Sequence, residues 1–258
     1  MIFDTHTHLN VKEFEGEEQD VIERAHKLGV TEMAIVGFDR DTIQRSFFLV
    51  EEFVNLYSIV GWHPTKARNF KKEIENWLFK EITSHQKVVG LGEIGLDYHW
   101  MKDPKKVQES VFRRQLAMAR ELKKPVIIHT REALEDTYRI LKDEGVPNGG
   151  IMHSFSGDME WMRKFLDLGM FISLSGVVTF KKGEEVHKVA KEVPITQLLV
   201  ETDAPFLTPV PYRGKRNEPG YARYVVEKIA NLREMPWQEV AKQTTKNAHR
   251  LFSLGENA

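Results

Sequence analysis

The sequence predicts an α/β protein, a closed (β/α)8 barrel of parallel strands whose site lies at the carboxyl ends of the strands. Three observations predict this fold. The chain has 258 residues, which is about the length that one such barrel needs. Short apolar runs rich in β-branched residues alternate with longer amphipathic stretches along the whole chain. Side chains that can bind metal recur where the apolar runs end.

Eight short apolar runs predict eight strands, because β-branched and aromatic residues favour the extended backbone. In chain order the runs are "MIFDTH" (1–6), "EMAIVG" (32–37), "LYSIVG" (56–61), "KVVGLGE" (87–93), "PVIIHT" (125–130), "GGIMHS" (149–154), "MFISLSG" (170–176) and "QLLVETD" (197–203).

The stretches between these runs predict helices. Examples are "EEQDVIERAHKLG" (17–29) and "VQESVFRRQLAMARELKK" (107–124), in which apolar residues recur at helical spacing. Several stretches end in Gly or in a Lys pair, as helix C-termini often do. Regular alternation of strand and helix predicts a parallel sheet, and an open doubly wound sheet would show the same periodicity. No linker-like tract divides the chain, so we expect one domain over residues 1–258.

Polar residues at the ends of the runs favour the closed barrel. The ends carry, in order, His6 and His8, His63, Glu93, His129, His153, Ser173 and Ser175, and Asp203. In an open sheet these side chains would be spread along an edge, whereas in a barrel they converge at one mouth. On a strand, Asp4, His6 and His8 would share one face. Buried His, Glu and Asp are costly unless they are paired or bind metal, so the pattern predicts a metal centre.

Composition narrows the class of protein. The chain has no cysteine, which excludes disulfides and thiolate metal sites and favours a reducing compartment. The start of the sequence shows no signal-peptide pattern, and no apolar run is long enough to cross a bilayer. We therefore expect a cytoplasmic protein without membrane contact. The net charge of −1 gives no bulk attraction to nucleic acid, although a local basic patch is compatible with it.

Several motifs, in this order and spacing, resemble the TatD family of metal-dependent hydrolases. They are "DTHTHLN", "GWHP", "GEIGLDYHW", "HSFSG" and "ETDAPFLTP", and the resemblance extends to "NAHRLF" near the C-terminus. The resemblance implies a TIM-type barrel with a two-metal centre and phosphodiesterase activity on DNA. By motif, the ligands of one metal are His6, His8, Glu93 and Asp203. Those of the second metal are Glu93, His129 and His153, with Glu93 as the bridge.

The chemistry of these residues agrees with such a centre. Two divalent ions about 3.5–4 Å apart can clamp a phosphate, activate a water and stabilise the leaving oxygen. A carboxylate has two oxygens and is a natural bridge, and Glu93 stands centrally in strand order. Asp203 is the other carboxylate expected at the mouth, which makes it the candidate general base. The mixed His/carboxylate set favours Zn²⁺ or a similar ion, whereas the resemblance implies Mg²⁺ or Mn²⁺.

Basic and aromatic residues in the segments after the strands predict a rim suited to a nucleic-acid backbone. The cations are Lys66, Arg68, Lys71, Lys72, Lys102, Lys105, Lys106, Arg131, Lys181, Lys182, Arg213, Lys215 and Arg216. The candidate stacking residues are Trp62, Trp100, Phe155, Phe180 and Tyr212. We expect DNA, single-stranded or with frayed ends, to be the substrate of an exonuclease-like enzyme, and no obligatory protein partner is evident.

The loop "PYRGKRNEPGY" (211–221) follows the last strand, where barrels often bind phosphate, and it resembles the family's substrate-side loop. In it we expect Arg213 and Arg216 to hold phosphate oxygens, with Asn217 and Glu218 orienting them. His63 of "GWHP" is expected to bind a phosphate oxygen.

Two other functions fit the same residues. One is a hydrolase on the same scaffold that cuts an amide, a lactone or an aminoacyl-tRNA ester, because fold and ligands fix the mechanism better than the substrate. The other is a binding module that has lost turnover, which a full set of six ligands argues against.

Overall fold

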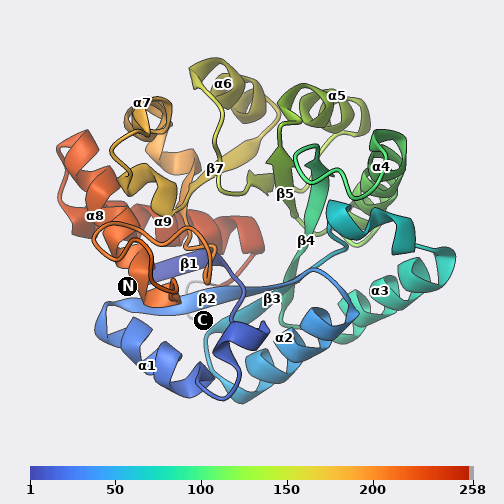
Figure 1. Cartoon of the computed structure of the whole chain (residues 1–258), viewed down its shortest axis with the longest axis horizontal. Coiled ribbons are helices and arrows are strands. Elements are labelled where there is room, and N and C mark those ends of the chain that lie inside the picture. The colour runs from blue at the N-terminus through green and yellow to red at the C-terminus, as the bar shows by residue number, and fades with distance from the viewer. Residues whose placement is uncertain (256–258) are drawn as a thin grey trace.

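Eight parallel strands follow one another around a barrel in chain order, as seen down the barrel in Figure 1 of the computed structural model, which describes residues 1–255. The strands are β1 (Ile2–Thr7), β2 (Val30–Gly37), β3 (Leu56–Val60), β4 (Val88–Asp97), β5 (Val126–Arg131), β6 (Gly150–Met152), β7 (Met170–Leu174) and β8 (Leu198–Val200). Each predicted run overlaps one of these strands. The predicted (β/α)8 barrel is therefore confirmed, and the open doubly wound alternative is wrong.

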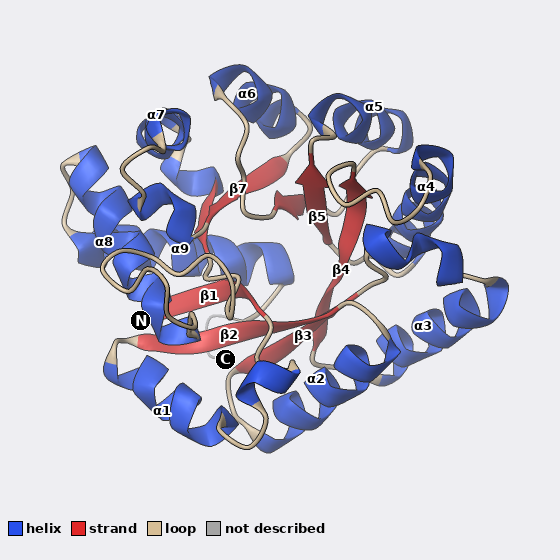
Figure 2. Ribbon diagram, viewed as in Figure 1, coloured by secondary structure: helices blue, strands red, loops and turns tan. Residues whose placement is uncertain are grey.

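Helices surround the strands as an outer ring (Figure 2). They are α1 (Glu18–Lys27), α2 (Arg40–Glu52), α3 (Lys72–Ser84), α4 (Lys105–Glu121), α5 (Leu134–Glu144), α6 (Met159–Asp167), α7 (Glu184–Glu192), α8 (Ala222–Arg233) and α9 (Trp237–Phe252). Short 3₁₀ helices span Lys12–Phe14, Pro64–Asn69, Gly176–Thr179, Ile195–Gln197 and Pro219–Tyr221. Within the described residues, no helix combines the length and apolar character that a membrane span requires.

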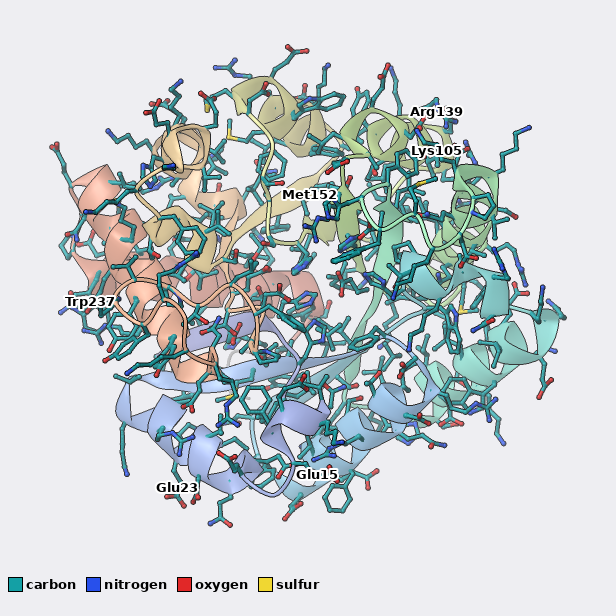
Figure 3. All side chains as sticks on the ribbon, viewed as in Figure 1. Glu15, Glu23, Lys105, Arg139, Met152 and Trp237 are labelled. Carbon is teal, nitrogen blue, oxygen red and sulfur yellow. The ribbon has the colours of Figure 1, made fainter. Side chains whose placement is uncertain are left out.

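The apolar core has two parts because strand side chains alternate between two faces. On β2, Met33 and Ile35 belong to the larger part, which also includes buried residues of the surrounding helices. Ala34 and Val36 of the same strand belong to the smaller part, together with Leu251 and Phe252 of α9. Figure 3 shows the contrast with the surface: the labelled Met152 lies within the ring of helices, whereas Glu15 and Glu23 lie at its edge.

Backbone and side-chain hydrogen bonds close the barrel between its first and last strands. The Asp203 amide donates to the His6 carbonyl over 2.9 Å, and the His8 amide donates to the Ala204 carbonyl over 2.8 Å. The Thr5 hydroxyl donates to the Val200 carbonyl over 2.9 Å. The residues that follow β8 are thus held directly against β1.

Asp4 serves this seam and does not join the histidines. Its carboxylate accepts hydrogen bonds from the Thr202 amide (2.9 Å) and the Thr202 hydroxyl (2.5 Å). Among the described residues, the clusters of donor atoms that contain His6 or His8 do not include Asp4. The pairing of β1 with β2 has a register shift between Asp4 and Thr7.

The fourth strand is longer than predicted, so Glu93 lies in the middle of β4 and not at its end. In the pairing with β5, Gly92 is opposite Ile127 and Ile94 is opposite Ile128, which leaves Glu93 as the extra residue of a register shift. Such bulges redirect side chains and are frequent beside active sites. Gly95 is required two residues later, because its φ is +141° and a Cβ there would lie 2.0 Å from the His129 carbonyl oxygen.

The last helix holds the amino-terminal end of the barrel together through polar contacts. Buried Asn247 of α9 donates from Nδ2 to the carbonyls of Ile195 (2.7 Å) and Leu198 (2.8 Å) at the start of β8. The Phe3 amide of β1 donates to the Thr245 hydroxyl over 3.2 Å. Helix α9, which includes the "NAHRLF" segment, therefore links β8 to β1 on the side opposite the site.

We expect Asn247→Ala to lower the free energy of unfolding by at least about 2 kcal/mol, since it leaves two buried carbonyls without a donor. The matched control is Lys246→Ala, which changes the exposed neighbour on the same helix and should stay within about 0.5 kcal/mol of the wild type. Urea unfolding followed by circular dichroism measures both, and equal stabilities would contradict the role given to Asn247.

Candidate metal centre

Two buried histidines from β1 and the residue after it meet at the carboxyl end of the barrel. The Nε2 atoms of His6 and His8 lie 3.2 Å apart. His8 Nδ1 lies 3.0 Å from the carbonyl oxygen of Val36 on β2, which orients the ring. The His6 ring stacks on that of His153 with centroids 3.7 Å apart. Two ring nitrogens that face each other at this distance can share one cation.

Asp203 approaches this pair from the loop that follows β8. Its Oδ1 lies 3.4 Å from His8 Nε2 and 3.8 Å from His6 Nε2. Its backbone has a φ of +56°, a left-handed conformation that Asp tolerates better than most residues. The three residues each offer one ligand atom, and these atoms lie within 4.8 Å of one another.

Glu93 lies between two groups of imidazoles and turns a different oxygen toward each group. Its Oε2 lies 3.7 Å from His6 Nε2 and 3.9 Å from His8 Nε2. Its Oε1 lies 2.7 Å from His129 Nδ1 and 3.5 Å from His153 Nε2. The carboxylate is therefore placed to contact two cations, one through each oxygen.

Burial and charge act in opposite directions on these groups. Burial alone would raise the pKa of Glu93, but the neighbouring imidazoles outweigh it and hold that pKa well below its usual range. Burial lowers the pKa of His129 and His153, yet the carboxylates around them raise it to about 9 and about 10. The pKa of His6 falls well below its usual range because of burial and the nearby His153. The centre thus combines a charged Glu93 carboxylate with imidazoles whose pKa values are shifted in opposite directions.

Two buried carboxylates behind the histidines were missed by sequence reasoning. Asp97, the last residue of β4, places Oδ2 2.9 Å from His129 Nε2. Glu201, the first residue after β8, places Oε1 2.7 Å from His153 Nδ1. Both stand inside motifs quoted above, and an acid next to an apolar strand run was the signal that could have identified them.

His63 reaches the same centre from the residue that precedes the 3₁₀ helix Pro64–Asn69. Its Nε2 lies 3.6 Å from Glu93 Oε1, and its ring centroid lies 4.6 Å from that of His129. The amide of Thr65 donates to His63 Nδ1 over 3.2 Å. His63, which is predicted to bind substrate, therefore lies beside Oε1 of Glu93.

The structure brings together all six residues that the sequence predicts as metal ligands. Their donor atoms fall into overlapping clusters, of which the members are His6, His8 and Asp203; His6, Glu93 and His153; and His63, Glu93 and His129. Imidazole and carboxylate donors at this spacing suit divalent cations such as Zn²⁺ or Mn²⁺. Within the described residues, the buried Nδ1 of His6 has no hydrogen-bond partner, whereas its Nε2 lies near carboxylate oxygens of Glu93 and Asp203. The residues present thus fit a metal centre.

The loop after β8 makes contacts that sequence reasoning did not predict. Arg216 places Nη2 2.8 Å from Glu17 Oε2, with its guanidinium 4.7 Å from the centre of the Phe14 ring. Glu218 accepts two hydrogen bonds of 2.8 Å from Arg24 of α1. These ion pairs connect the loop to the segment around α1.

Asn217 is fully buried in the same loop and donates to the Thr202 carbonyl over 2.9 Å. Arg216, Asn217 and Glu218, which are predicted to bind substrate, thus contact other parts of the protein, and their substrate roles stay a prediction. Arg213 is different: it is exposed, with its guanidinium 3.8 Å from the centre of the Phe180 ring.

The residues predicted for the rim differ in their exposure and in their contacts. Of the predicted stacking residues, Trp62 and Phe155 are buried in the core. Trp100 has 58% of its surface exposed. Phe206, which sequence reasoning missed, is 53% exposed, and its ring centroid lies 6.2 Å from that of His8. Ion pairs engage some of the predicted cations, namely Lys66, Arg68, Lys72 and Arg216.

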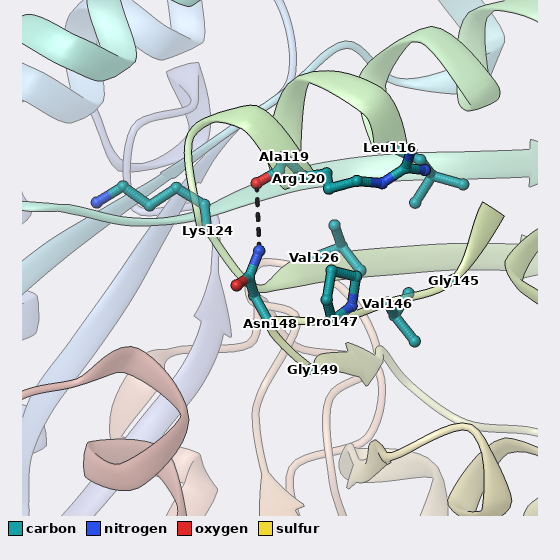
Figure 4. Close-up of a pocket in the computed structure, with 10 residues that line it drawn as sticks. All are labelled: Leu116, Ala119, Arg120, Lys124, Val126, Gly145, Val146, Pro147, Asn148 and Gly149. Atoms are coloured by element: carbon teal, nitrogen blue, oxygen red, sulfur yellow. Dashed lines mark hydrogen bonds between the residues drawn. The ribbon is translucent and has the colours of Figure 1, made fainter.

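A crevice at the opposite end of the strands is not a competing site. It lies between the end of α4 and the segment before β6, where Asn148 Nδ2 donates to the Ala119 carbonyl over 3.5 Å (Figure 4). Its volume is about 10 Å³, which is room for roughly one water molecule.

Comparisons with known proteins agree with this geometry. A family model described as "TatD related DNase" matches residues 3–253. The uncharacterized metal-dependent hydrolase YabD of Bacillus subtilis is 49% identical over 98% of this chain and 100% of that protein. The uncharacterized metal-dependent hydrolase YcfH of Escherichia coli K12 is 38% identical over 98% and 96% of the two chains. The crystal structure of the TatD homologue YjjV from E. coli K12 superimposes with a TM-score of 0.92 at 28% identity, covering 98% of both chains.

Cation binding at this centre should release protons and strengthen as the pH rises. With pKa values of about 9 and about 10, the rings of His129 and His153 are doubly protonated and positively charged near neutral pH in the metal-free protein. A histidine must lose one of these two protons before it can bind a metal. We expect titration calorimetry with Zn²⁺ near neutral pH, in buffers of different ionisation enthalpy, to detect proton release. An affinity that is the same from pH 6.5 to pH 8.5 would contradict this expectation.

Proposed function

Because this chain belongs to the TatD-related DNase family of metal-dependent hydrolases, we propose that it hydrolyses phosphodiester bonds of DNA with the help of two divalent cations. The observation that carries the proposal is the position of Glu93, whose two oxygens face two different groups of imidazoles. A single cation would need only one of these groups. Two cations explain why both surround the same carboxylate.

The proposed ligands of one cation are His6, His8, Glu93 and Asp203, and those of the other are Glu93, His129 and His153. When bound, such a pair of cations polarises the phosphate and lowers the pKa of a water molecule. Zn²⁺ and Mn²⁺ suit the mixed donors, and Mg²⁺ is the further candidate that the family suggests.

Asp203 is proposed to accept the proton of the attacking water. Its side chain keeps 13% of its surface exposed, so that it faces the mouth, and its Oδ1 is near His6 and His8 without a closer partner than 3.4 Å. The hydrogen bond from the Asp203 amide to the His6 carbonyl fixes the position of Asp203. A base that is fixed at the mouth can take a proton without first rearranging.

His63 is proposed to hold a phosphate oxygen. The Thr65 amide donates to Nδ1, so the neutral ring carries its hydrogen on Nε2. That N–H is directed toward the centre, since Nε2 lies 3.6 Å from Glu93 Oε1. A donor in this position can stabilise the negative charge that develops on a phosphate oxygen.

The exposed aromatics favour a DNA end whose bases are unpaired. Trp100 and Phe206 offer ring faces on the loops after β4 and β8, and bases can stack on such faces only when they are free of a duplex. Arg213 is the loop cation proposed to contact the phosphate backbone. We therefore propose an exonuclease-like action on single-stranded or frayed ends. An assay panel of single-stranded DNA, duplex DNA, an aminoacyl-tRNA and a lactone tests this choice of substrate.

Asp203→Asn should reduce the turnover of DNA by about 10²–10⁴-fold, because it removes a positioned base and one negative charge. Binding of DNA should change far less. Glu93→Gln is the comparison and should lower the occupancy of both cations, measured by elemental analysis of the purified protein. An Asp203→Asn protein that cleaves DNA near the wild-type rate with both cations bound would show that Asp203 is not the base.

Arg213→Ala should weaken binding of single-stranded DNA, and the loss should be larger at low salt because phosphate contacts are screened. Arg216→Ala is the matched control: it also removes one cation from the loop, but its partners are Glu17 and Glu218. We expect fluorescence anisotropy over a salt series to show a smaller slope for Arg213→Ala than for Arg216→Ala. A slope for Arg213→Ala that equals that of the wild type would contradict the role proposed for Arg213.

A further inference from the structure

Each histidine at the centre has an outer ring nitrogen as well as an inner one, and the partner of the outer nitrogen decides what the inner one can do. A neutral imidazole carries one hydrogen, so a nitrogen that donates outward leaves a lone pair on the other nitrogen. A nitrogen that accepts from outside leaves an N–H on the inner side. Only the first arrangement produces a metal ligand.

His129 is arranged to bind through Nδ1. Its Nε2 lies 2.9 Å from Asp97 Oδ2, and an ionised carboxylate can only accept. Asp97 is itself fixed, because it is 1% exposed and accepts from the Trp100 amide over 2.8 Å. Gln108 adds a second constraint: it accepts from the Asp97 amide and donates to the Asp97 carbonyl. Because Nε2 donates to Asp97, Nδ1 is the nitrogen that is left to bind a cation once its own proton is lost, and it lies 2.7 Å from Glu93 Oε1.

His153 is arranged to bind through the opposite nitrogen. Its Nδ1 lies 2.7 Å from Glu201 Oε1, although the N–H direction is poorly aligned with that oxygen. Glu201 is fully buried and accepts from the Ser154 amide over 2.8 Å, which holds the carboxylate behind the ring. Its other oxygen, Oε2, has no partner within the described residues. A buried carboxylate with an unused oxygen is costly to keep unless the imidazole in front of it needs the charge.

We propose that Asp97 and Glu201 are the positioning residues of the centre, and that they make His129 bind a cation through Nδ1 and His153 through Nε2. The inference rests on the two-cation centre of the proposed function. Carboxylates behind metal-binding histidines orient the ring and raise its basicity, and their loss typically costs about 10–100-fold in metal affinity. His63 shows the opposite arrangement, since its outer Nδ1 accepts from the Thr65 amide.

The test measures metal binding by the full chain without nucleic acid, so that the nature of the substrate does not enter. Zn²⁺ is titrated into metal-free protein in competition with a chromophoric chelator. Asp97→Leu and Glu201→Leu should each weaken one of two equivalents by about 10–100-fold. Asp97→Asn and Glu201→Gln keep an acceptor oxygen and should restore much of the affinity. The control Asp136→Asn removes a carboxylate that binds Tyr98 and Arg139 and contacts no histidine, so its affinity should match the wild type.

Nitrogen-15 spectra of the Zn²⁺-loaded wild type give a second readout that requires no variant to fold. The expected result is a protonated Nε2 and a metal-bound Nδ1 for His129, and the reverse for His153. The same nitrogen bound in both residues would overturn the proposal, as would leucine variants that fold and bind both equivalents with wild-type affinity. A wild type that binds only one equivalent would instead contradict the two-cation centre of the proposed function.

Discussion

The constraint on which the rest of the structure depends is the burial of one carboxylate, Glu93, among imidazoles at the mouth of the barrel. A charged group in such a place is tolerated only if every direction around it is occupied by a partner. The register shift in β4 turns the side chain inward, and Gly95 lets β5 approach closely enough to bring His129 beside it. The partners in turn need their own support, which comes from buried carboxylates one layer further out. The site thus consists of the Glu93 carboxylate, the imidazoles around it and the buried carboxylates behind two of those imidazoles.

The contacts that close the barrel also bring residues of the site together. His6 is on the first strand, His8 directly follows that strand, and Asp203 is in the loop after the last strand, so that ligands of one proposed cation stand on both sides of the seam. The backbone bonds that join Asp203 to His6 and His8 to Ala204 are seam contacts and also fix the positions of ligands. Asp4 and Thr202 lock the same junction with side chains. Any loosening here would separate donor atoms that must stay within a few ångströms.

Most of the fold and the central residues of the site could be predicted from the sequence, because both depend on local periodicity and residue type. The eight runs rich in β-branched residues and their polar ends required no tertiary information. What could not be predicted depends on register and on distant partners. The shift that places Glu93 inside β4 changes no local pattern, and the roles of Asp97 and Glu201 depend on histidines 32 and 48 residues away along the chain. The prediction for the loop after β8 was based on the charges of the loop itself. Arg216 and Glu218 of this loop form ion pairs with Glu17 and Arg24, which are distant in the sequence.

The linkage of β8 to β1 through α9 has a consequence for the order in which the protein assembles. β1 precedes β8 and the Asn247 helix in the chain, so the edge of β1 that faces β8 finds its partners only when these distant segments meet. Pairing the two ends of a long chain carries a high loop-closure cost and is slow compared with local contacts. We therefore expect the donor atoms of His6 and His8 to meet that of Asp203 late in folding, after the distant segments have paired.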